Sequence, residues 1–213
     1  MTEPTTISWS ELERFRAEGF KRFGAIHDIS IVDLRTELRR MADGTGKVLD
    51  VGAGAHKPLL RILDGIDVDY HSLDTDPAGD FDFHDVGDIP PDLRFELAVA
   101  NQILEHVTPD MALEIVRGVG EVLAPGGRFA ATVPNTSHPV RQWNAMHVTA
   151  WPVLDLYGLF RLAGLEVEQV ARYTKRRLTF RPIRRIIVKT VAREYRVDWC
   201  DSILIVGRRP VGG

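Results

Sequence analysis

The chain has 213 residues, of which 44% are hydrophobic and 27% are charged, and its formal net charge at pH 7 is −3. These values are typical of an ordinary globular protein with one core, and the negative charge argues against bulk nucleic-acid binding. No apolar run approaches the roughly 20 residues of a membrane span, and the N-terminus lacks the basic and apolar regions of a signal peptide. We therefore expect a cytoplasmic protein without a transmembrane segment.

Two helices are predicted before the first strand. Ser8 and Glu11 have the spacing of a capping box that opens a helix ending near Phe23, and residues 28–41 carry apolar side chains at helical spacing. We expect these helices to form a lid over a bound ligand, with four aromatic side chains on the core: Trp9, Phe15, Phe20 and Phe23. A helix pair that covers the sheet without a part in the chemistry is an equal alternative.

Residues 48–51 have the pattern of a buried strand, and this strand runs directly into a turn that contains Gly52 and Gly54. Glycine is needed where the backbone must turn tightly and let a ligand approach the main chain. The segment therefore predicts a nucleotide-cofactor cradle. The third glycine of the dinucleotide fingerprint is absent, since Lys57 occupies its position, and no phosphate-loop Gly-Lys-Ser/Thr follows.

Strands and helices then alternate, which predicts a parallel sheet covered on both faces. A helix over 58–63 precedes a second strand that ends at Asp74, about twenty residues after the glycines and placed to hold a ribose diol. A third short strand over 81–84 ends at Asp85 and Val86, which suit an exocyclic amine and a purine face.

The fourth strand, 95–100, runs into Asn101 and Gln102, and a fifth follows at 129–133. A polar loop at 134–150 leaves the end of the fifth strand, where ligands sit in open α/β sheets. Its composition is that of an acceptor pocket, with His138, Arg141, Trp143, Asn144 and His147. A helix at 151–163 and strands at 165–173 and 201–206 complete the pattern, and the single cysteine, Cys200, is expected in the core beside the last strand.

Three motifs in order, Val48 to Gly54, Leu104 to Val107 and Leu123 to Gly127, carry a family resemblance. Over residues 46–207 the chain resembles a class I S-adenosylmethionine-dependent methyltransferase of the small-molecule, type 11-like group. The resemblance implies a Rossmann-like, doubly wound seven-stranded sheet, mostly parallel with an antiparallel last strand. It implies one domain over 1–213, with N-terminal helices at 1–45, a cofactor half at 46–133 and an acceptor half at 134–213 that includes a basic helix insertion at 174–197.

The resemblance also implies the cofactor residues. The methionine end would be lined by Asp50, Gly52 and Gly54, the ribose held by Asp74, and the adenine by Asp85 and Val86; Asn101 and Gln102 would lie beneath the sulfonium. One departure is His56, which stands where the commonest motif has a third glycine.

An alcohol is a weak acid, so an O-methyltransferase needs a general base or a metal. His147 is the first candidate base and His138 the second, although each also suits a loop histidine that bonds backbone. His106 is expected to order the sheet edge or the sulfonium pocket, beside the substrate residues Arg141, Trp143 and Asn144. His84 and Asp85 could join His147 or Glu105 around a Mg²⁺ ion.

Exocyclic base amines of nucleic acid are disfavoured as acceptors, because no Asn/Asp-Pro-Pro-Tyr/Phe follows the fourth strand, and we expect a small-molecule acceptor. By resemblance we favour a hydroxyl of a sugar or polysaccharide precursor. Another secondary metabolite and a non-catalytic S-adenosylmethionine-binding role stay open, whereas a nicotinamide-dependent oxidoreductase is disfavoured by Lys57.

Residues 172–196 are strongly basic and contain one acid, Glu194. A helix near 182–195 would place arginines on one face and apolar residues on the other. A solvated outer face, an anionic or lipid-linked acceptor dock, a membrane-surface contact and a homodimer seam are all open interpretations.

Overall fold

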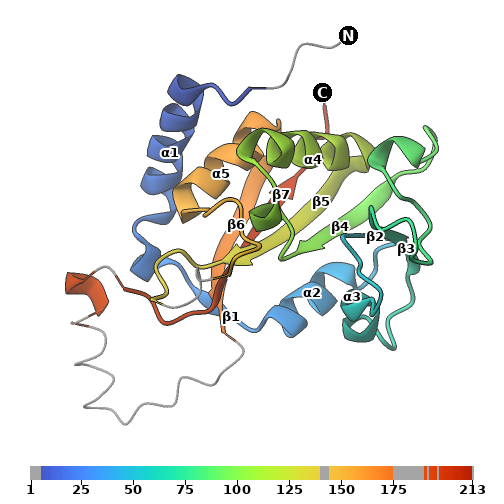
Figure 1. Cartoon of the computed structure of the whole chain (residues 1–213), viewed down its shortest axis with the longest axis horizontal. Coiled ribbons are helices and arrows are strands. Elements are labelled where there is room, and N and C mark those ends of the chain that lie inside the picture. Colours follow the sequence, from blue (N-terminus) through green and yellow to red (C-terminus); the bar gives the residue numbers. More distant parts are fainter. Residues whose placement is uncertain (1–5, 140–143, 175–189, 191, 196, 213) are drawn as a thin grey trace.

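The computed structural model describes residues 6–139, 144–174, 190, 192–195 and 197–212. Within these ranges one sheet has the strand order β1-β6-β7-β5-β4-β2-β3 (Figure 1). The strands are β1 Ile31–Val32, β2 Lys47–Val51, β3 Asp69–Leu73, β4 Phe95–Asn101, β5 Leu123–Pro134, β6 Glu166–Tyr173 and β7 Ser202–Arg208. Of these strands, only β7 runs antiparallel to its neighbours, β5 and β6. The expected Rossmann-like sheet with an antiparallel last strand is confirmed.

Helices cover both faces of the sheet. Their bounds are α1 Trp9–Phe23, α2 Leu34–Ala42, α3 Pro58–Ile62, α4 Pro109–Val122 and α5 Val153–Leu162. Figure 1 shows α1, α4 and α5 on one side of the sheet and α2 and α3 on the other. Each side has its own buried apolar cluster, because apolar side chains alternate between the two faces of every strand. None of the helices in the described ranges has the length and apolar character of a membrane span.

The register of three central strands positions the site. β2 pairs with β4 through Val51 and Ala100, and β4 pairs with β5 through Asn101 and Thr132, all in parallel. The carboxyl ends of these strands therefore meet at one edge of the sheet. Because the chain continues from β2 outward to β3 and then returns to β4 on the other side of β2, this edge contains the topological switch point where open α/β sheets bind ligands.

The predicted strand over 81–84 is wrong. The segment makes one isolated bridge, between Leu73 and Phe83. The carboxylate of Asp82 accepts hydrogen bonds from the backbone N–H and the hydroxyl of Ser72, each at 2.7 Å, so a side chain takes a donor that a strand ladder would use. The seventh strand is instead β1, at the opposite edge of the sheet, where Ile31 pairs with Arg172.

The second predicted helix begins later than expected. Residues 28–33 form the end of a short 3₁₀ turn and then β1, and α2 starts only after Asp33. The Asp33 carboxylate accepts the N–H of Thr36 at 2.8 Å, and this bond holds the pKa of Asp33 below its ordinary value. An aspartate cap inside an apolar periodic pattern therefore sets the helix start.

The first helix matches its predicted bounds, but the expected capping box does not form: the Ser8 side chain makes no cap bond. α1 packs on α5, where a Cβ at Gly158 would lie 2.5 Å from Leu12. Phe15 and Phe23 contact the core, whereas Trp9 and Phe20 are 65% and 56% exposed and correct that part of the expectation. α1 is thus an outer cover over α5.

Arg172, which begins the basic segment, is buried. Its guanidinium pairs with Asp198 at 3.0 Å and donates to the carbonyl oxygen of Ile29. Asp198 also accepts from Asn135 at 2.6 Å, so the three polar groups satisfy one another in the core. Cys200 is fully buried beside β7, as predicted. Most of the expected basic helix near 182–195 lies outside the described residues.

Candidate active site

The turn after β2 has two glycines with left-handed backbone. Gly52 has φ +70° and Gly54 has φ +60°, which L side chains rarely adopt. A Cβ at Gly52 would lie 2.2 Å from Cδ1 of Ile103, whereas a Cβ at Gly54 would meet nothing within 4 Å. Gly52 is therefore needed for packing, and Gly54 leaves open space above the main chain. Lys57, at φ 41°, completes the turn without the third glycine.

Asp74 closes the cradle from the end of β3. One carboxylate oxygen accepts the N–H of Gly54 at 2.8 Å, and the other accepts the N–H of Asp76 at 3.1 Å. Each oxygen keeps a second lone pair for a further donor. The arrangement fits a ribose, whose two hydroxyl groups are donors that a partly exposed carboxylate can accept.

The segment after Phe83 supplies the next wall. The Asp85 carboxylate caps a short 3₁₀ turn by accepting the N–H of Gly87 at 2.7 Å, and Val86 packs near Gly118 of α4. The Nδ1 atom of His84 lies 3.1 Å from the carbonyl oxygen of Asp74. These residues therefore share one side of the cradle with Asp74.

The end of β4 carries strained backbone. Gln102 has φ +61°, although it is not glycine. Thr132 of β5 holds it: the Gln102 N–H donates to the Thr132 carbonyl oxygen at 3.0 Å, and the Thr132 hydroxyl donates to Asn101 Oδ1 at 2.7 Å. Asn101 and Gln102 are thus fixed at the edge next to the glycine turn.

Asp50 lies deeper than the other predicted cofactor residues. It is 3% exposed, and its Oδ2 accepts the hydroxyl of Tyr70 at 2.7 Å. Burial raises the pKa of Asp50 to about 6, partly offset by the Tyr70 hydrogen bond. Tyr70 on β3 is the partner that the sequence pattern did not indicate.

A small cavity of about 150 Å³ adjoins the end of β4. It is lined by Glu105, Pro134, Thr136, His147, Val148, Thr149, Ala150 and Trp151. Glu105 is 2% exposed, and neither of its carboxylate oxygens has a hydrogen-bond partner among the described residues. Burial raises the pKa of Glu105 to about 7. A buried carboxylate without a partner is costly, which makes this cavity a candidate ligand site.

Two histidines stand beside Glu105. The rings of His106 and His147 are 5.1 Å apart, edge to face. His106 Nδ1 lies 3.0 Å from the carbonyl oxygen of Met146, and His147 Nε2 lies 3.2 Å from the side-chain amide nitrogen of Asn144. Burial and the nearby His106 lower the pKa of His147, so its neutral form is favoured at pH 7.

The other predicted acceptor residues divide into three groups. Asn144 contacts His147 directly. His138 is not among the residues that line the cavity: its ring meets that of Trp199 edge to face at 6.2 Å, and its backbone N–H donates to the carbonyl oxygen of Asn135. Arg141 and Trp143 lie outside the described residues.

The expected metal set is corrected. Among the described residues, the group of His and acidic side chains close enough to share an ion is Glu105, His106 and His147. His84 and Asp85 are not in it, because the backbone bonds of both hold them on the cradle side near Asp74 and Gly87.

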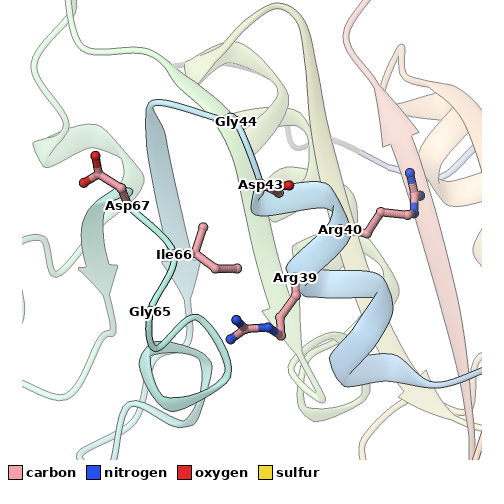
Figure 2. Close-up of a pocket in the computed structure, with 7 residues that line it drawn as sticks. All are labelled: Arg39, Arg40, Asp43, Gly44, Gly65, Ile66 and Asp67. Carbon is pink, nitrogen blue, oxygen red and sulfur yellow. The ribbon is translucent and has the colours of Figure 1, made fainter.

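A second hollow, of about 560 Å³, lies at the opposite end of the strands (Figure 2). Its walls come from the end of α2 and the segment before β3, so it faces the amino ends of β2 and β3. Arg39 is already occupied there, since it donates to the carbonyl oxygens of Ile62 and Asp64 at 2.7 and 2.8 Å. This hollow takes no part in the site.

Sequence reasoning missed two further residues of the site. Thr132 is a polar residue inside the otherwise apolar run 129–133, which is the signal that could have indicated its role. Trp151 lines the cavity and donates its indole N–H to the carbonyl oxygen of Leu104 at 2.9 Å. No spacing rule would have connected Trp151 with Leu104.

A family model described as "Methyltransferase domain" matches residues 22–170. No curated protein matches the chain.

Solved structures share the fold at low identity. One is the complex of the Haloferax volcanii Trm112 methyltransferase activator with a protein described as a methyltransferase, at 20% identity, TM-score 0.60, and 94% and 96% coverage of the two chains. A SAM-dependent methyltransferase from Archaeoglobus fulgidus is 13% identical over 91% of this chain and 99% of its own, with TM-score 0.60. The N-methyltransferase NodS from Bradyrhizobium japonicum WM9, with bound S-adenosyl-L-homocysteine, is 14% identical over 95% and 98%, with TM-score 0.55.

Gly54 and Gly44 make a matched pair for testing the cradle, since each has positive φ and a Cβ added at either would meet no atom within 4 Å. We expect Gly54→Ala and Gly44→Ala each to lower the free energy of unfolding by about 1 kcal/mol through backbone strain. Only Gly54→Ala should weaken S-adenosylmethionine binding, by roughly tenfold or more. Urea unfolding and calorimetric titration check both; equal affinities in the two variants would rule out a cradle at Gly54.

Asp50 should make stability depend on pH. Its carboxyl ionises near pH 4 in the unfolded chain but near pH 6 in the folded chain. Its contribution to the free energy of unfolding is therefore present below pH 4 and is lost as the pH rises through 6. The full cost of ionising it in the folded chain is roughly 3 kcal/mol. Asp50→Asn should remove this fall in the free energy of unfolding between pH 4 and 7. Urea unfolding across that range measures it, and parallel curves for both proteins would contradict the assignment.

Proposed function

This chain belongs to the methyltransferase-domain family and is a class I S-adenosylmethionine-dependent methyltransferase, and we propose that its acceptor is a hydroxyl of a small molecule, a saccharide or polysaccharide precursor. When bound, S-adenosylmethionine supplies a methyl group already activated on a sulfonium. The protein must then place the acceptor in line, exclude water and remove the hydroxyl proton.

The cradle supports cofactor binding at the switch point. Gly54 leaves room for a ligand at the main chain, and Asp74 offers carboxylate lone pairs beside it. Asp85 and Val86 lie on the same side, where we assign the adenine. Asn101 and Gln102, held by Thr132, face the adjoining edge, where we assign the sulfonium.

The observation that carries the acceptor proposal is the cavity of Glu105 and His147. Glu105, which lines the cavity, is three residues after Gln102 in the sequence. We therefore place an acceptor inside the cavity next to the assigned sulfonium position. Amines and thiols often need no help in losing a proton, whereas a hydroxyl does. A neutral imidazole beside a buried carboxylate suits a hydroxyl, and a lining that combines polar side chains with Trp151 suits a saccharide.

Asp74 provides the test of the cofactor assignment. Asp74→Ala removes a charged acceptor of hydrogen bonds, each worth roughly 1.5–3 kcal/mol, so S-adenosylmethionine and S-adenosylhomocysteine should bind about 10 to 100 times more weakly. Asp74→Asn keeps the shape and should lose less. Calorimetry measures all three proteins, with NAD⁺ as the negative ligand. Wild-type protein that binds neither sulfur compound would refute the cofactor role.

His147 provides the test of acceptor chemistry. His147→Ala should lower kcat by about 100-fold or more, because proton removal depends on this side chain, while S-adenosylhomocysteine affinity stays unchanged. Met146→Ala is the control, since that side chain lies in the same loop and is 70% exposed. Transfer of a labelled methyl group to a panel of saccharides and other polyols gives the rates.

Three results would redirect the proposal. Full activity of His147→Ala refutes its role, and loss of activity in His138→Ala instead would move that role to His138. Methylation of amines alone would replace the hydroxyl by a nitrogen acceptor. Cofactor binding without turnover of any acceptor would favour a non-catalytic binding protein.

A further inference from the structure

We propose that Glu105, His106 and His147 bind a divalent transition-metal ion of the zinc type. One potential ligand atom from each residue lies within 4.8 Å of the others. Metal–ligand bonds of about 2.0–2.2 Å place the ligand atoms roughly 3–4 Å from one another. Small side-chain movements toward a bound ion would bring the three atoms to this separation. No other described trio of His, Cys, Asp or Glu side chains meets this criterion.

Glu105 is the observation that points to a ligand. Its side chain is buried, with 2% of the residue exposed, and both oxygens lack a hydrogen-bond partner among the described residues. Burying a carboxylate in this way is unfavourable unless a positive charge compensates it. The described residues that line its cavity include no Lys or Arg, and in this proposal a bound cation supplies the compensating charge.

The two imidazoles indicate a metal rather than an organic cation. His106 Nδ1 lies 3.0 Å from the carbonyl oxygen of Met146, and since a carbonyl only accepts, this nitrogen carries the proton. Nε2 of His106 therefore presents a lone pair. A histidine that donates one N–H to a backbone carbonyl and binds a metal through the other nitrogen is the usual outer-shell arrangement.

The loop that carries His147 is fastened to the same residues. The carbonyl oxygen of Glu105 accepts the N–H groups of Val148 and Thr149 at 2.8 and 3.0 Å. Asn144 accepts the N–H of Met146 through Oδ1 and places its amide nitrogen at His147 Nε2. Nε2 is thus an acceptor, and a metal there would replace the hydrogen bond from Asn144. Residues about 40 positions apart are held together by these bonds before any ion arrives.

The donor set selects the ion. Two imidazole nitrogens and one carboxylate oxygen suit Zn²⁺, Co²⁺ or Fe²⁺, whereas Mg²⁺ prefers oxygen ligands and retains water. Three protein ligands also leave a coordination position open toward the cavity.

The consequence for chemistry rests on the proposed function. A metal in this position would lower the pKa of a bound acceptor hydroxyl, which then loses its proton to water. His147 would act as a metal ligand in place of a general base. His147→Ala would remove activity in either role, so metal binding itself must be measured.

The experiment uses the full chain, freed of metal with a chelator and studied without cofactor or acceptor. We expect Co²⁺ to bind with one-to-one stoichiometry and to give visible absorption bands of a low-coordinate site. Zn²⁺ should abolish the bands by displacement, and excess Mg²⁺ should leave them unchanged. Calorimetry with ZnCl₂ gives the affinity.

Four variants locate the ion. Glu105→Gln and His147→Ala should each weaken Zn²⁺ binding about 100-fold or more, whereas His84→Ala and Met146→Ala should bind as the wild type does. Circular dichroism confirms that each is folded; if Glu105→Gln is not, His106→Ala, at an exposed residue, replaces it. Absence of Co²⁺ and Zn²⁺ binding, or equal binding by all variants, overturns the proposal.

These results separate the metal from the methyl acceptor. Methylation of hydroxyl acceptors by chelator-treated protein that binds no Zn²⁺ would overturn the metal site and leave the proposed function standing. Zn²⁺ binding lost in Glu105→Gln and His147→Ala would support the site even if only nitrogen acceptors were methylated, which would refute the hydroxyl proposal alone.

Discussion

The contact between the Gly52 backbone and Ile103 is the constraint on which the site depends. Any side chain at position 52 would overlap Ile103, so the turn after β2 and the loop after β4 can approach only because residue 52 is glycine. The two strands are parallel neighbours, and the contact lies at their common carboxyl end. It joins the proposed cofactor cradle of Gly54 and Asp74 to the segment that leads through Gln102 to Glu105.

Rigid strands support unfavourable features at this edge. Gln102 has left-handed backbone, and Glu105 is a buried carboxylate without a partner among the described residues. Both are unfavourable in an isolated segment, and both follow a strand whose core residues Ala98, Val99 and Ala100 are fully buried. Thr132 on the next strand fixes the distorted backbone with several hydrogen bonds. Strain of this kind persists where the surrounding packing overdetermines the geometry, and it concentrates at functional sites.

The sequence predicted the sheet well because buried parallel strands leave a strong local signal. Apolar runs identified β2, β4 and β5, a polar segment that ends at Asp74 was correctly predicted as β3, and the last strand was correctly placed antiparallel. Predictions failed where one side chain overrode the pattern. Asp33 starts α2 later than the apolar spacing suggests, and Asp82 bonds to Ser72 where a strand was expected. Such choices depend on a single hydrogen bond and have no periodicity to reveal them.

In the site, too, contacts set by local sequence could be predicted, whereas contacts between distant segments could not. The adjacency of Gly54 and Asp74 could be predicted because the glycines and Asp74 occur at fixed offsets from their strands. The grouping of Glu105 with His147 could not, because it depends on how a loop leaving β5 folds back on the end of β4. Sequence reasoning instead joined His84 and Asp85 with His147 or Glu105, since carboxylate ligands suit Mg²⁺. Their backbone bonds turn them toward the cradle, so a shared edge is necessary for a common site but does not decide which side chains meet.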